Sequence, residues 1–373
     1  MAGMKSRGAT MSFPGKFSKL RGSERSLPCG GPWLARSVQS WSNRHGFGLL
    51  ASPLSSHLAL GCKLSVLDAF CPHGGANLCG GSVVDDHLQC PFHLWEFKSD
   101  GGVGKVPWLD EPPAHIKAKT WPFVEYHGMV CVWFDAEGRA PLYQPPRVAQ
   151  IDDGRMRFCG SWDVNRPIYM HLIEYMENTV DVQHFTPMHG KMSIPWTTVQ
   201  IPGVEVKFDS KVVLGSEDGA EKLGPANSPH FLYFLNTSSL TFYGKDVPRT
   251  TARVEVQFIG PGSIVRFLFT IPDLGEIVMF QTHLPLLENR GLAQRIRYQW
   301  FASNNIPKAL ASYVVGEWVS NWWADVGVWE EKIRKNAPAL VKGDGPIQRG
   351  RRWFKQFYSE SSAEASTPQS FDW

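Results

Sequence analysis

Two short cysteine–histidine pairs constrain this chain more than any other feature of its sequence. Cys71-Pro72-His73 is followed, after sixteen residues, by Cys90-Pro91-Phe92-His93. Proline or glycine punctuates each pair, which predicts two turns. Zinc sites usually begin with two cysteines two to four residues apart, and a one-residue gap between cysteine and histidine fits that pattern poorly. The spacing therefore predicts two ligand-bearing loops around a different metal centre.

The donor set favours an iron–sulfur cluster. Two thiolates can hold one iron of a Rieske [2Fe–2S] centre while two neutral imidazoles hold the other. Four glycines between the pairs, Gly74, Gly75, Gly80 and Gly81, suit loops whose backbone N–H groups approach the sulfurs closely. We therefore predict four cluster ligands: Cys71, His73, Cys90 and His93.

The remaining cysteines show no metal spacing. The chain has seven cysteines, and an odd number argues against a fully paired disulfide framework. We expect four of them to be small buried hydrophobic residues: Cys29, Cys62, Cys131 and Cys159.

Length and composition exclude several classes of protein. A chain of 373 residues with 43% hydrophobic residues is long enough for two domains that each bury a core. Its net charge of +3 is too small to indicate a nucleic-acid partner. The most apolar stretch, residues 46–62, contains proline, serines and a histidine, and is too short to predict a membrane-spanning helix.

The two ends differ from the body of the chain. Residues 1–45 are rich in arginine, lysine and serine with one acidic residue, which predicts a disordered segment or an organelle-targeting peptide. We expect no strands in residues 1–60, and a flexible serine-rich tail over residues 361–373. Pro145-Pro146 predicts a boundary between a small β domain, residues 46–143, and a larger α+β domain, residues 144–360.

Periodicity predicts mostly strands with two long helices. Trp121–Tyr126 and Met129–Phe134 flank His127-Gly128, which predicts a hairpin. Further strands are expected at Val204–Phe208, Phe231–Leu235, Arg253–Phe258, Ile264–Ile271 and Ile277–His283. Helices are expected at Tyr169–Phe185 and Ile306–Ile333.

The first of these helices carries a second cluster of candidate ligands. Glu177, Asp181 and His184 lie at positions i, i+4 and i+7, and hence on one helix face, with Glu174 one turn earlier on the same side. Like charges at this spacing destabilise a helix by roughly 0.2–0.5 kcal/mol per pair, so we expect a cation nearby. Pro187 predicts a helix end or kink that lets the imidazoles of His184 and His189 converge.

Two histidines need one carboxylate to complete the facial triad of a non-haem Fe(II) oxygenase. Asp325 interrupts the apolar stripe of the late helix, and an aspartate on a buried face must be paired or bound to metal. Glu330 and Glu331 lie off that stripe, and we expect both to be solvated. The predicted iron ligands are therefore His184, His189 and Asp325.

Together these motifs resemble the α subunits of Rieske non-haem iron oxygenases, over residues 64–360. Asn178-x2-Asp181-x2-His184-x4-His189 is similar to the iron-binding helix of that family. Within it the sequence resembles the cholesterol 7-desaturase (Neverland) family most. The residues that carry this resemblance are Leu67–Leu78, Glu177-Asn178, Trp329–Lys332, Lys342–Ile347 and Arg352–Tyr358.

The resemblance implies an α+β fold: a small all-β Rieske domain followed by a helix-grip (START-like) catalytic domain over an antiparallel sheet. The resemblance assigns four ligands to the cluster and three to the iron, and these are the same seven residues that are predicted above. Asp181 becomes the carboxylate that links a cluster histidine of one subunit to an iron histidine of its neighbour in a homotrimer. The substrates implied are a sterol and O2, and the product carries a new 7,8 double bond.

Electrons are expected from NAD(P)H through a separate ferredoxin or flavin reductase, because the sequence contains no Gly-x-Gly-x-x-Gly fingerprint of its own. Family resemblance also implies association with a membrane of the endoplasmic reticulum. Two positions depart from the family pattern, namely Gly74, where leucine or arginine is usual, and Leu94, where glycine is usual.

Four alternative functions remain at this point. A steroid ring hydroxylase would share both metal sites. A plastid chlorophyll-breakdown oxygenase would suit the basic N-terminus, but its C-terminal Cys-x-x-Cys is absent, since no cysteine follows Cys159. A Rieske electron carrier needs no second iron, and a lipid-binding module with a helix-grip cavity would tolerate loss of the iron ligands.

Overall fold

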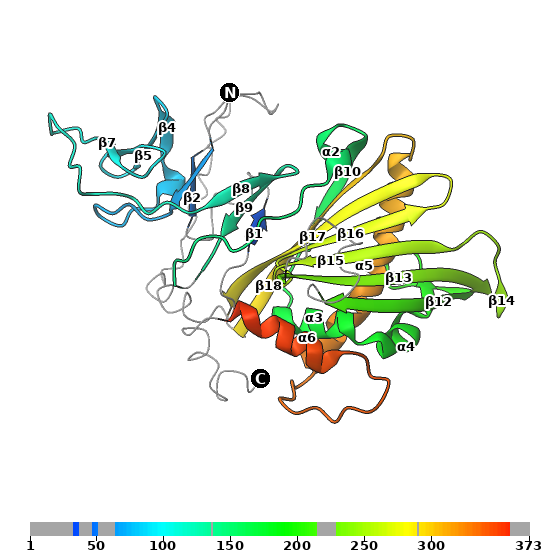
Figure 1. Ribbon diagram of the computed structural model, residues 1–373. Coiled ribbons are helices and arrows are strands. Elements are labelled where there is room, and N and C mark those ends of the chain that lie inside the picture. Colours follow the sequence, from blue (N-terminus) through cyan, green and yellow to red (C-terminus); the bar gives the residue numbers. More distant parts are fainter. Residues whose placement is uncertain are drawn as a thin grey trace, which may run out of the picture.

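The computed structural model describes residues 33–36, 47–50, 64–135, 137–214, 229–288 and 291–358. Three small sheets precede one large, curled antiparallel sheet that is accompanied by helices (Figure 1). The expected α+β class, with a small all-β part followed by an antiparallel-sheet domain, is confirmed. Cys29, Cys62 and the expected C-terminal tail lie outside the described residues.

The small sheets are built from short strands. A four-stranded sheet has the order β4 (Ser82–Val84), β5 (His87–Gln89), β6 (Glu96–Phe97), β7 (Val103–Lys105). A three-stranded sheet contains β1 (Trp33–Arg36), β9 (Met129–Trp133) and β8 (Phe123–Tyr126). β2 (Phe47–Leu50) pairs with β3 (Ser65–Asp68).

The expectation that residues 1–60 contain no strands is wrong at β1 and β2. Each is four residues long and pairs antiparallel with a later strand, β1 with β9 and β2 with β3. So short a segment carries little periodicity, and its hydrogen bonds depend on a partner that is distant in sequence.

The predicted hairpin at His127-Gly128 is confirmed. Both residues have positive φ, 48° and 81°, as a two-residue type I′ turn between twisted strands requires. Buried side chains of this hairpin belong to the same hydrophobic core as the large sheet. Gln299 donates from Nε2 to the His127 carbonyl over 2.6 Å, which ties the hairpin to the large sheet. Cys131 is fully buried there, as expected.

The large sheet contains every further strand that periodicity predicted. Its order is β10 (Met156–Asp163), β18 (Gly291–Ser303), β17 (Gly275–Glu288), β16 (Ile264–Ile271), β15 (Ala252–Ile259), β13 (Phe231–Phe242), β12 (Gln200–Leu214), β11 (Lys191–Ser193), with β14 (Lys245–Asp246) paired to β13. The strand β18 escaped prediction because Gln294 and Gln299 are buried there, which hides the alternation of polar and apolar residues. Cys159, on the edge strand β10, is only partly buried, so that expectation is wrong.

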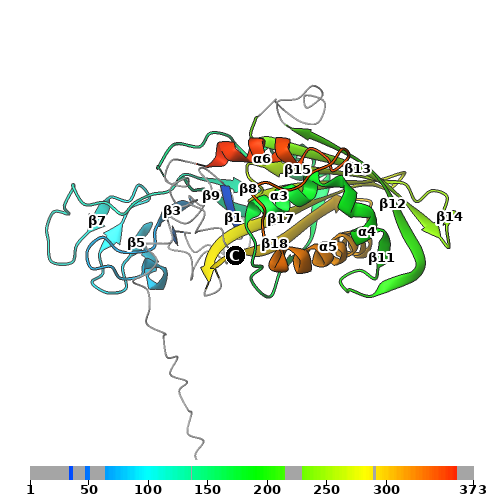
Figure 2. The same cartoon turned by 90° about the horizontal axis from the view of Figure 1, so that it is seen from below.

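Helices cover one side of this sheet (Figure 2). The long helix α5 (Lys308–Glu331) confirms the predicted late helix. The predicted helix Tyr169–Phe185 is instead three pieces: α3 (Leu172–Val180), the 3-10 turn η4 (Val182–His184) and α4 (Phe185–His189). The C-terminal helix α6 (Ile347–Phe354) packs against α3. Shorter elements are α2 (Ala149–Asp152) and the 3-10 turns η3 (Leu78–Gly80) and η6 (Lys355–Phe357).

None of the helices in the described part of the chain combines the length and the apolar character that spanning a membrane requires.

Candidate metal centres and substrate cavity

The four predicted cluster ligands lie on two adjacent loops. Cys71 and Cys90 are buried, with 3% and 1% of their surface exposed. His73 is exposed and His93 partly exposed, and their ring centroids are 4.7 Å apart. The two thiols therefore lie inside the domain and the two imidazoles at its surface, with Trp95 stacked on the His73 ring at 4.5 Å.

The backbone of these loops provides donors for sulfur. Burial raises the pKa of the Cys71 thiol, the backbone N–H of His73 opposes this by favouring the thiolate, and the neighbouring Cys90 thiol raises it further. The loops approach each other closely, because a Cβ on Gly81 would lie 2.1 Å from the Gln89 carbonyl oxygen. Two adjacent thiols and two outer imidazoles fit the donor set of a Rieske [2Fe–2S] centre.

The two departures from the family pattern differ in their consequences. A Cβ on Gly74 would meet no atom closer than 3.9 Å, so the structure leaves space for a side chain at this position. Leu94, in contrast, adopts φ of 58°, a left-handed conformation that costs a residue with a side chain roughly 1–2 kcal/mol. Its backbone N–H still closes the loop by donating to the Cys90 carbonyl over 3.1 Å.

The three predicted iron ligands converge from separate elements. His184 ends η4, His189 ends α4, and Asp325 lies on α5. One ligand atom of each lies within 4.8 Å of the other two. The His189 Nε2 and His184 Nε2 atoms are 3.2 and 3.9 Å from Oδ1 of Asp325.

The backbone bends at a different residue than the sequence predicts. Asp181 ends α3 in an extended conformation, φ −82° and ψ 91°, so Glu177, Asp181 and His184 do not share one helix face. Pro187 lies in the first turn of α4, where its missing N–H leaves no hydrogen bond unmade. The prediction of a kink at Pro187 is therefore wrong, although the two imidazoles converge as expected.

The break at Asp181 orients His184. The backbone carbonyl of Asp181 accepts from Nδ1 of His184 over 2.5 Å, which leaves Nε2 directed toward Asp325. The amide Nδ2 of Asn178 lies 3.2 Å from that Nε2 atom. Fixing one ring nitrogen by a backbone carbonyl is the usual way to orient a metal-binding imidazole.

The electrostatics of this group suit a cation. Asp325 is buried, with 6% of its surface exposed, and its partners among the described residues are imidazoles. Burial lowers the pKa of His184 and so favours the neutral, metal-binding form of the ring. A buried carboxylate is costly without a positive partner. Two neutral imidazoles and one carboxylate fit a facial triad.

Asp181 is placed differently from the triad. Its carboxylate is partly exposed and accepts from the Gln183 backbone N–H over 3.1 Å. Its backbone carbonyl makes the hydrogen bond with His184, and its carboxylate acts on that imidazole electrostatically.

The triad forms one end of a cavity of about 390 Å³ between the sheet and α5. Its walls are mostly apolar side chains from β12, β13, β15, β16 and α5, among them Phe208, Phe234, Val254, Phe267, Leu310 and Trp318. Such a cavity favours an apolar ligand that is buried beside a few polar groups.

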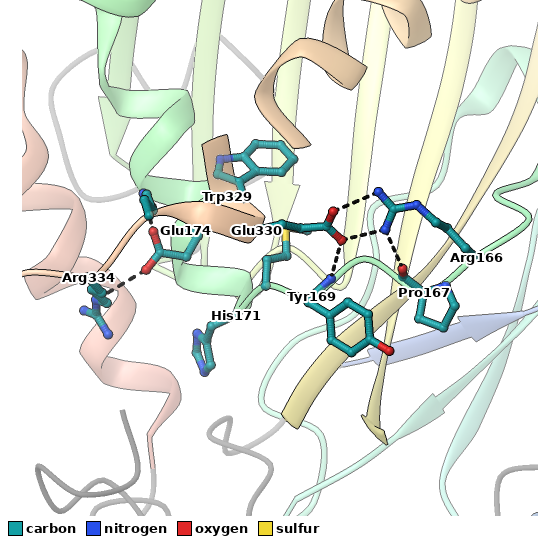
Figure 3. Close-up of a pocket in the computed structure, with 10 residues that line it drawn as sticks. Arg166, Pro167, Tyr169, His171, Glu174, Trp329, Glu330 and Arg334 are labelled. Atoms are coloured by element: carbon teal, nitrogen blue, oxygen red, sulfur yellow. Dashed lines mark hydrogen bonds and ion pairs between the residues drawn. The ribbon is translucent and has the colours of Figure 1, made fainter. Parts of the chain in front are cut away.

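Ion pairs hold α5, which carries Asp325, and α3, which precedes the two histidines (Figure 3). Glu330 accepts two hydrogen bonds from Arg166, at 2.6 and 2.8 Å, and a third from the Tyr169 backbone N–H. These residues line a second pocket of about 600 Å³, which has several charged side chains in its wall and is distinct from the apolar cavity. The expectation that Glu330 is solvated is therefore wrong. Its partner Arg166 is distant in sequence, so the periodicity of the helix could not predict this contact.

The positive charge expected beside the acidic residues of α3 comes from lysine and arginine side chains. Glu174 pairs with Lys332 and with Arg334, and Glu177 pairs with Arg334 and Arg351. Gly345, with φ of 84°, passes so close to α3 that a Cβ there would lie 2.5 Å from the Val180 carbonyl oxygen. The C-terminal segment thus braces α3 immediately before the break at Asp181.

Sequence reasoning missed two residues of the cavity wall, Glu317 and Asn321. They precede Asp325 on α5 by eight and four residues and share its face. The signal was present as polar residues at every fourth position of an otherwise apolar stripe.

Comparisons with known proteins agree with this geometry. A family model described as the 3-ketosteroid 9alpha-hydroxylase C-terminal domain matches residues 132–358, and one described as the Rieske [2Fe-2S] domain matches residues 57–122. The "Cholesterol 7-desaturase nvd" of Xenopus laevis is 31% identical over 332 residues, which cover 87% of this chain and 70% of that protein. The "Cholesterol 7-desaturase" of Caenorhabditis elegans is 33% identical over 302 residues, 80% of this chain and 68% of that protein.

A bacterial relative carries a different name. The "Probable 3-ketosteroid-9-alpha-monooxygenase, oxygenase component" of Rhodococcus rhodochrous is 27% identical over 312 residues, 79% of this chain and 71% of that protein. Among solved structures, "Pseudomonas putida CBB5 NdmA with caffeine" superposes with a TM-score of 0.58 at 18% identity, over 93% of this chain and 95% of that one. At that identity the match shows the fold alone.

Proposed function

This chain belongs to the Rieske oxygenase family that contains cholesterol 7-desaturases and 3-ketosteroid 9-alpha-hydroxylases, and we propose that it introduces the 7,8 double bond into a sterol. One observation carries the proposal: an apolar cavity of about 390 Å³ has His184, His189 and Asp325 at one end. Relatives named cholesterol 7-desaturase make cholesterol the first substrate to test.

The proposed ligands divide between two centres. Cys71, Cys90, His73 and His93 would hold the [2Fe–2S] cluster, and His184, His189 and Asp325 would hold a mononuclear Fe(II). When bound, these groups supply electron transfer and activation of O2. The protein contributes an apolar wall that excludes water and holds the sterol ring edge beside the triad.

The proposed reaction balances as a desaturation. The sterol loses one hydrogen atom from C7 and one from C8, and a C=C bond forms between these carbons. O2 takes up both hydrogen atoms together with two electrons from NAD(P)H and two protons, and leaves as two molecules of water. NAD(P)H acts through a separate ferredoxin or flavin reductase, in line with a relative named as an oxygenase component.

We further propose that the protein works as a homotrimer in which Asp181 of one subunit links its iron site to the cluster of a neighbour. The partly exposed position of the Asp181 side chain, beside the backbone that holds His184, supports this role. Asp181→Asn keeps the size of the side chain, and we expect it to slow reduction of the iron centre while leaving iron content unchanged.

Association with a membrane of the endoplasmic reticulum is part of the same proposal, because a sterol partitions into lipid. Fractionation of cells that express the full chain tests it. Recovery in a mitochondrial or plastid fraction would instead support the organelle-targeting interpretation of residues 1–45.

One alternative within the family has a specific observation behind it. The C-terminal family model and the Rhodococcus relative both carry 3-ketosteroid 9-alpha-oxygenation in their names. Hydroxylation would need the same ligands and the same electrons, and would differ in the ring carbon placed at the triad.

Product analysis separates the candidates. The full chain, loaded with iron and cluster, is supplied with cholesterol, a reductase, NADPH and O2, and the sterols are analysed by mass spectrometry. We expect 7-dehydrocholesterol, with its conjugated-diene absorbance, from the wild type and from the control variant Glu331→Gln, whose side chain is exposed. A hydroxylated product would support the hydroxylase, and no product from fully loaded protein would support a carrier or a lipid-binding module.

A further inference from the structure

Glu317 is an unusual residue in the cavity wall. Apart from Asp325, the charged residues that line the cavity are Glu317 and Arg249, and Arg249 is exposed to solvent. Glu317 is partly buried, and burial raises the pKa of its carboxyl. It therefore places a carboxyl group among apolar side chains on the same helix face as Asp325.

The environment of Glu317 differs from that of the buried glutamates on α3. Glu174 and Glu177 each pair with lysine or arginine. Within the part of the chain that the structure describes, the hydrogen-bond partner of Glu317 is the side chain of Asn321, whose Nδ2 donates to Oε1 over 2.7 Å. A carboxyl group without a cation costs stability. Its position facing the cavity indicates that a ligand compensates for this cost.

We propose that Glu317 and Asn321 bind a hydroxyl group of the substrate and thereby select a hydroxylated sterol over the corresponding ketone. This inference rests on the proposed function, because it takes the cavity to be the sterol site. Glu317 and Asn321 are binding residues in this account and take no part in the chemistry.

Hydrogen-bond chemistry determines the preference. A hydroxyl group both donates and accepts, so it satisfies Glu317 as carboxylate or as carboxylic acid. A carbonyl group only accepts, so it leaves an ionised Glu317 without a donor and places two acceptors together. A site built around a hydroxyl rejects an analogue that cannot complete its hydrogen bonds.

The placement along α5 suits a rigid substrate. Glu317 precedes Asp325 by eight residues, which corresponds to about 12 Å of helix rise at ~1.5 Å per residue. Between the two, the cavity wall on this helix is formed by Trp318, Asn321 and Trp322. A fused ring system anchored by its hydroxyl at Glu317 would present another ring edge toward the triad.

Equilibrium binding to the full chain tests the proposal without relying on turnover. Quenching of tryptophan fluorescence, to which Trp318 and Trp322 of the cavity wall contribute, reports affinity for three probes: cholesterol, its 3-deoxy analogue and its 3-ketone. We expect the wild type to bind cholesterol about tenfold more tightly than either analogue, which is the usual cost of leaving a buried hydrogen-bonding group unsatisfied. Glu317→Ala should remove this preference and leave the affinity for the 3-deoxy analogue unchanged.

A second variant keeps the test informative if alanine disturbs folding. Glu317→Gln preserves size and adds an N–H donor, so we expect affinity for the 3-ketone to rise about tenfold relative to cholesterol. Glu331→Gln, at an exposed position of α5 outside the cavity wall, serves as control and should leave the preference of the wild type intact.

Equal affinity of the wild type for all three probes, or equal weakening of all three by Glu317→Ala, would overturn the inference. The outcome is separable from that of the proposed function. A hydroxyl preference with no 7,8-unsaturated product refutes the desaturation alone, whereas a 7,8-unsaturated product without a hydroxyl preference refutes the role of Glu317 alone.

Discussion

The loops around Cys71 and Cys90 and the triad around Asp325 assemble candidate ligands by different means. The cluster ligands all lie within residues 71–93, on two loops whose geometry is held by backbone hydrogen bonds such as Cys71 N–H to the Ala76 carbonyl and Cys90 N–H to the Trp95 carbonyl. The proposed iron ligands come from η4 and α4, which are adjacent in sequence, and from α5, which lies far later in the chain. Their geometry depends on how separate elements pack.

This difference has an energetic counterpart. The imidazoles of the cluster loops face solvent, whereas His189 and Asp325 are buried and belong to a region held by buried ion pairs. A site held by local backbone hydrogen bonds keeps its geometry when other parts of the protein change. A site assembled from distant elements loses its geometry when the contacts between those elements weaken. We therefore expect mutations outside the ligands to affect the iron site more than the cluster.

The largest expected effect comes from the triad itself. Asp325→Ala removes the carboxylate and leaves two imidazoles, so we expect turnover to fall to the level of a mixture without the protein, while the visible spectrum of the cluster persists. Product formation with NADPH, reductase and O2 measures the first, and absorption spectroscopy the second. Appreciable turnover by Asp325→Ala would contradict the assignment of the third ligand, provided that Glu331→Gln behaves as wild type.

The second-largest effect, on the free energy of unfolding, is expected from the ion pairs of α3. Arg351 donates from Nη2 to Glu177 over 2.9 Å, and Arg351→Met leaves that buried carboxylate with the longer contact to Arg334. Breaking a buried pair typically costs about 3–5 kcal/mol, so we expect a decrease in the free energy of unfolding of about 3 kcal/mol in urea denaturation.

The control for that variant lies on the same helix. Arg352 is exposed on α6, and Arg352→Met should change the free energy of unfolding by less than about 0.5 kcal/mol. Equal effects of the two substitutions would show that the ion pair with Glu177 does not brace α3.

A smaller effect is expected where the C-terminal segment passes α3. Gly343 and Gly345 both have positive φ, 105° and 84°, so alanine at either position is strained by about 1–2 kcal/mol. Only at Gly345 would the new Cβ also meet the backbone of α3, 2.5 Å from the Val180 carbonyl oxygen. We expect Gly345→Ala to destabilise more than Gly343→Ala and to weaken iron retention, measured by metal analysis after dialysis.

The smallest effect concerns the cluster loop and has the opposite sign. Leu94→Gly relieves the left-handed backbone at φ of 58°, and the gain is partly offset by the greater freedom of glycine in the unfolded chain. We expect a net stabilisation of about 0.5–1 kcal/mol and slower loss of cluster absorbance on warming. Leu109→Gly, a nearby exposed leucine without positive φ, should not stabilise.

The contrast between the two sites also explains what the sequence could predict. The cluster motif is local, so spacing alone placed its four candidate ligands on two loops. The late helix and Asp325 were also predictable, since a single charge in an apolar stripe stands out in a helix of 24 residues. The hairpin at His127-Gly128 followed from turn chemistry for the same local reason.

The errors fall where hydrogen bonds and tertiary contacts, which periodicity does not show, decide the structure. The break at Asp181 is not encoded by glycine or proline; it forms where the carbonyl of Asp181 turns to accept from His184. Glu330 lies off the apolar stripe, yet Arg166, distant in sequence, makes it a structural contact. Glu317 and Asn321 were overlooked although they precede Asp325 at four-residue spacing, because that spacing does not show that a cavity faces them.

Iron content per chain tests the central claim most directly, namely that this protein holds two separate metal centres with the proposed ligands. The wild type, Asp325→Ala and Cys90→Ala are purified as full chains, and iron and acid-labile sulfide are measured for each. The account predicts three irons and two sulfides in the wild type, two irons and two sulfides in Asp325→Ala, and one iron without sulfide in Cys90→Ala. Iron lost from both centres in either variant, with the protein still folded, would contradict the separation of the two sites.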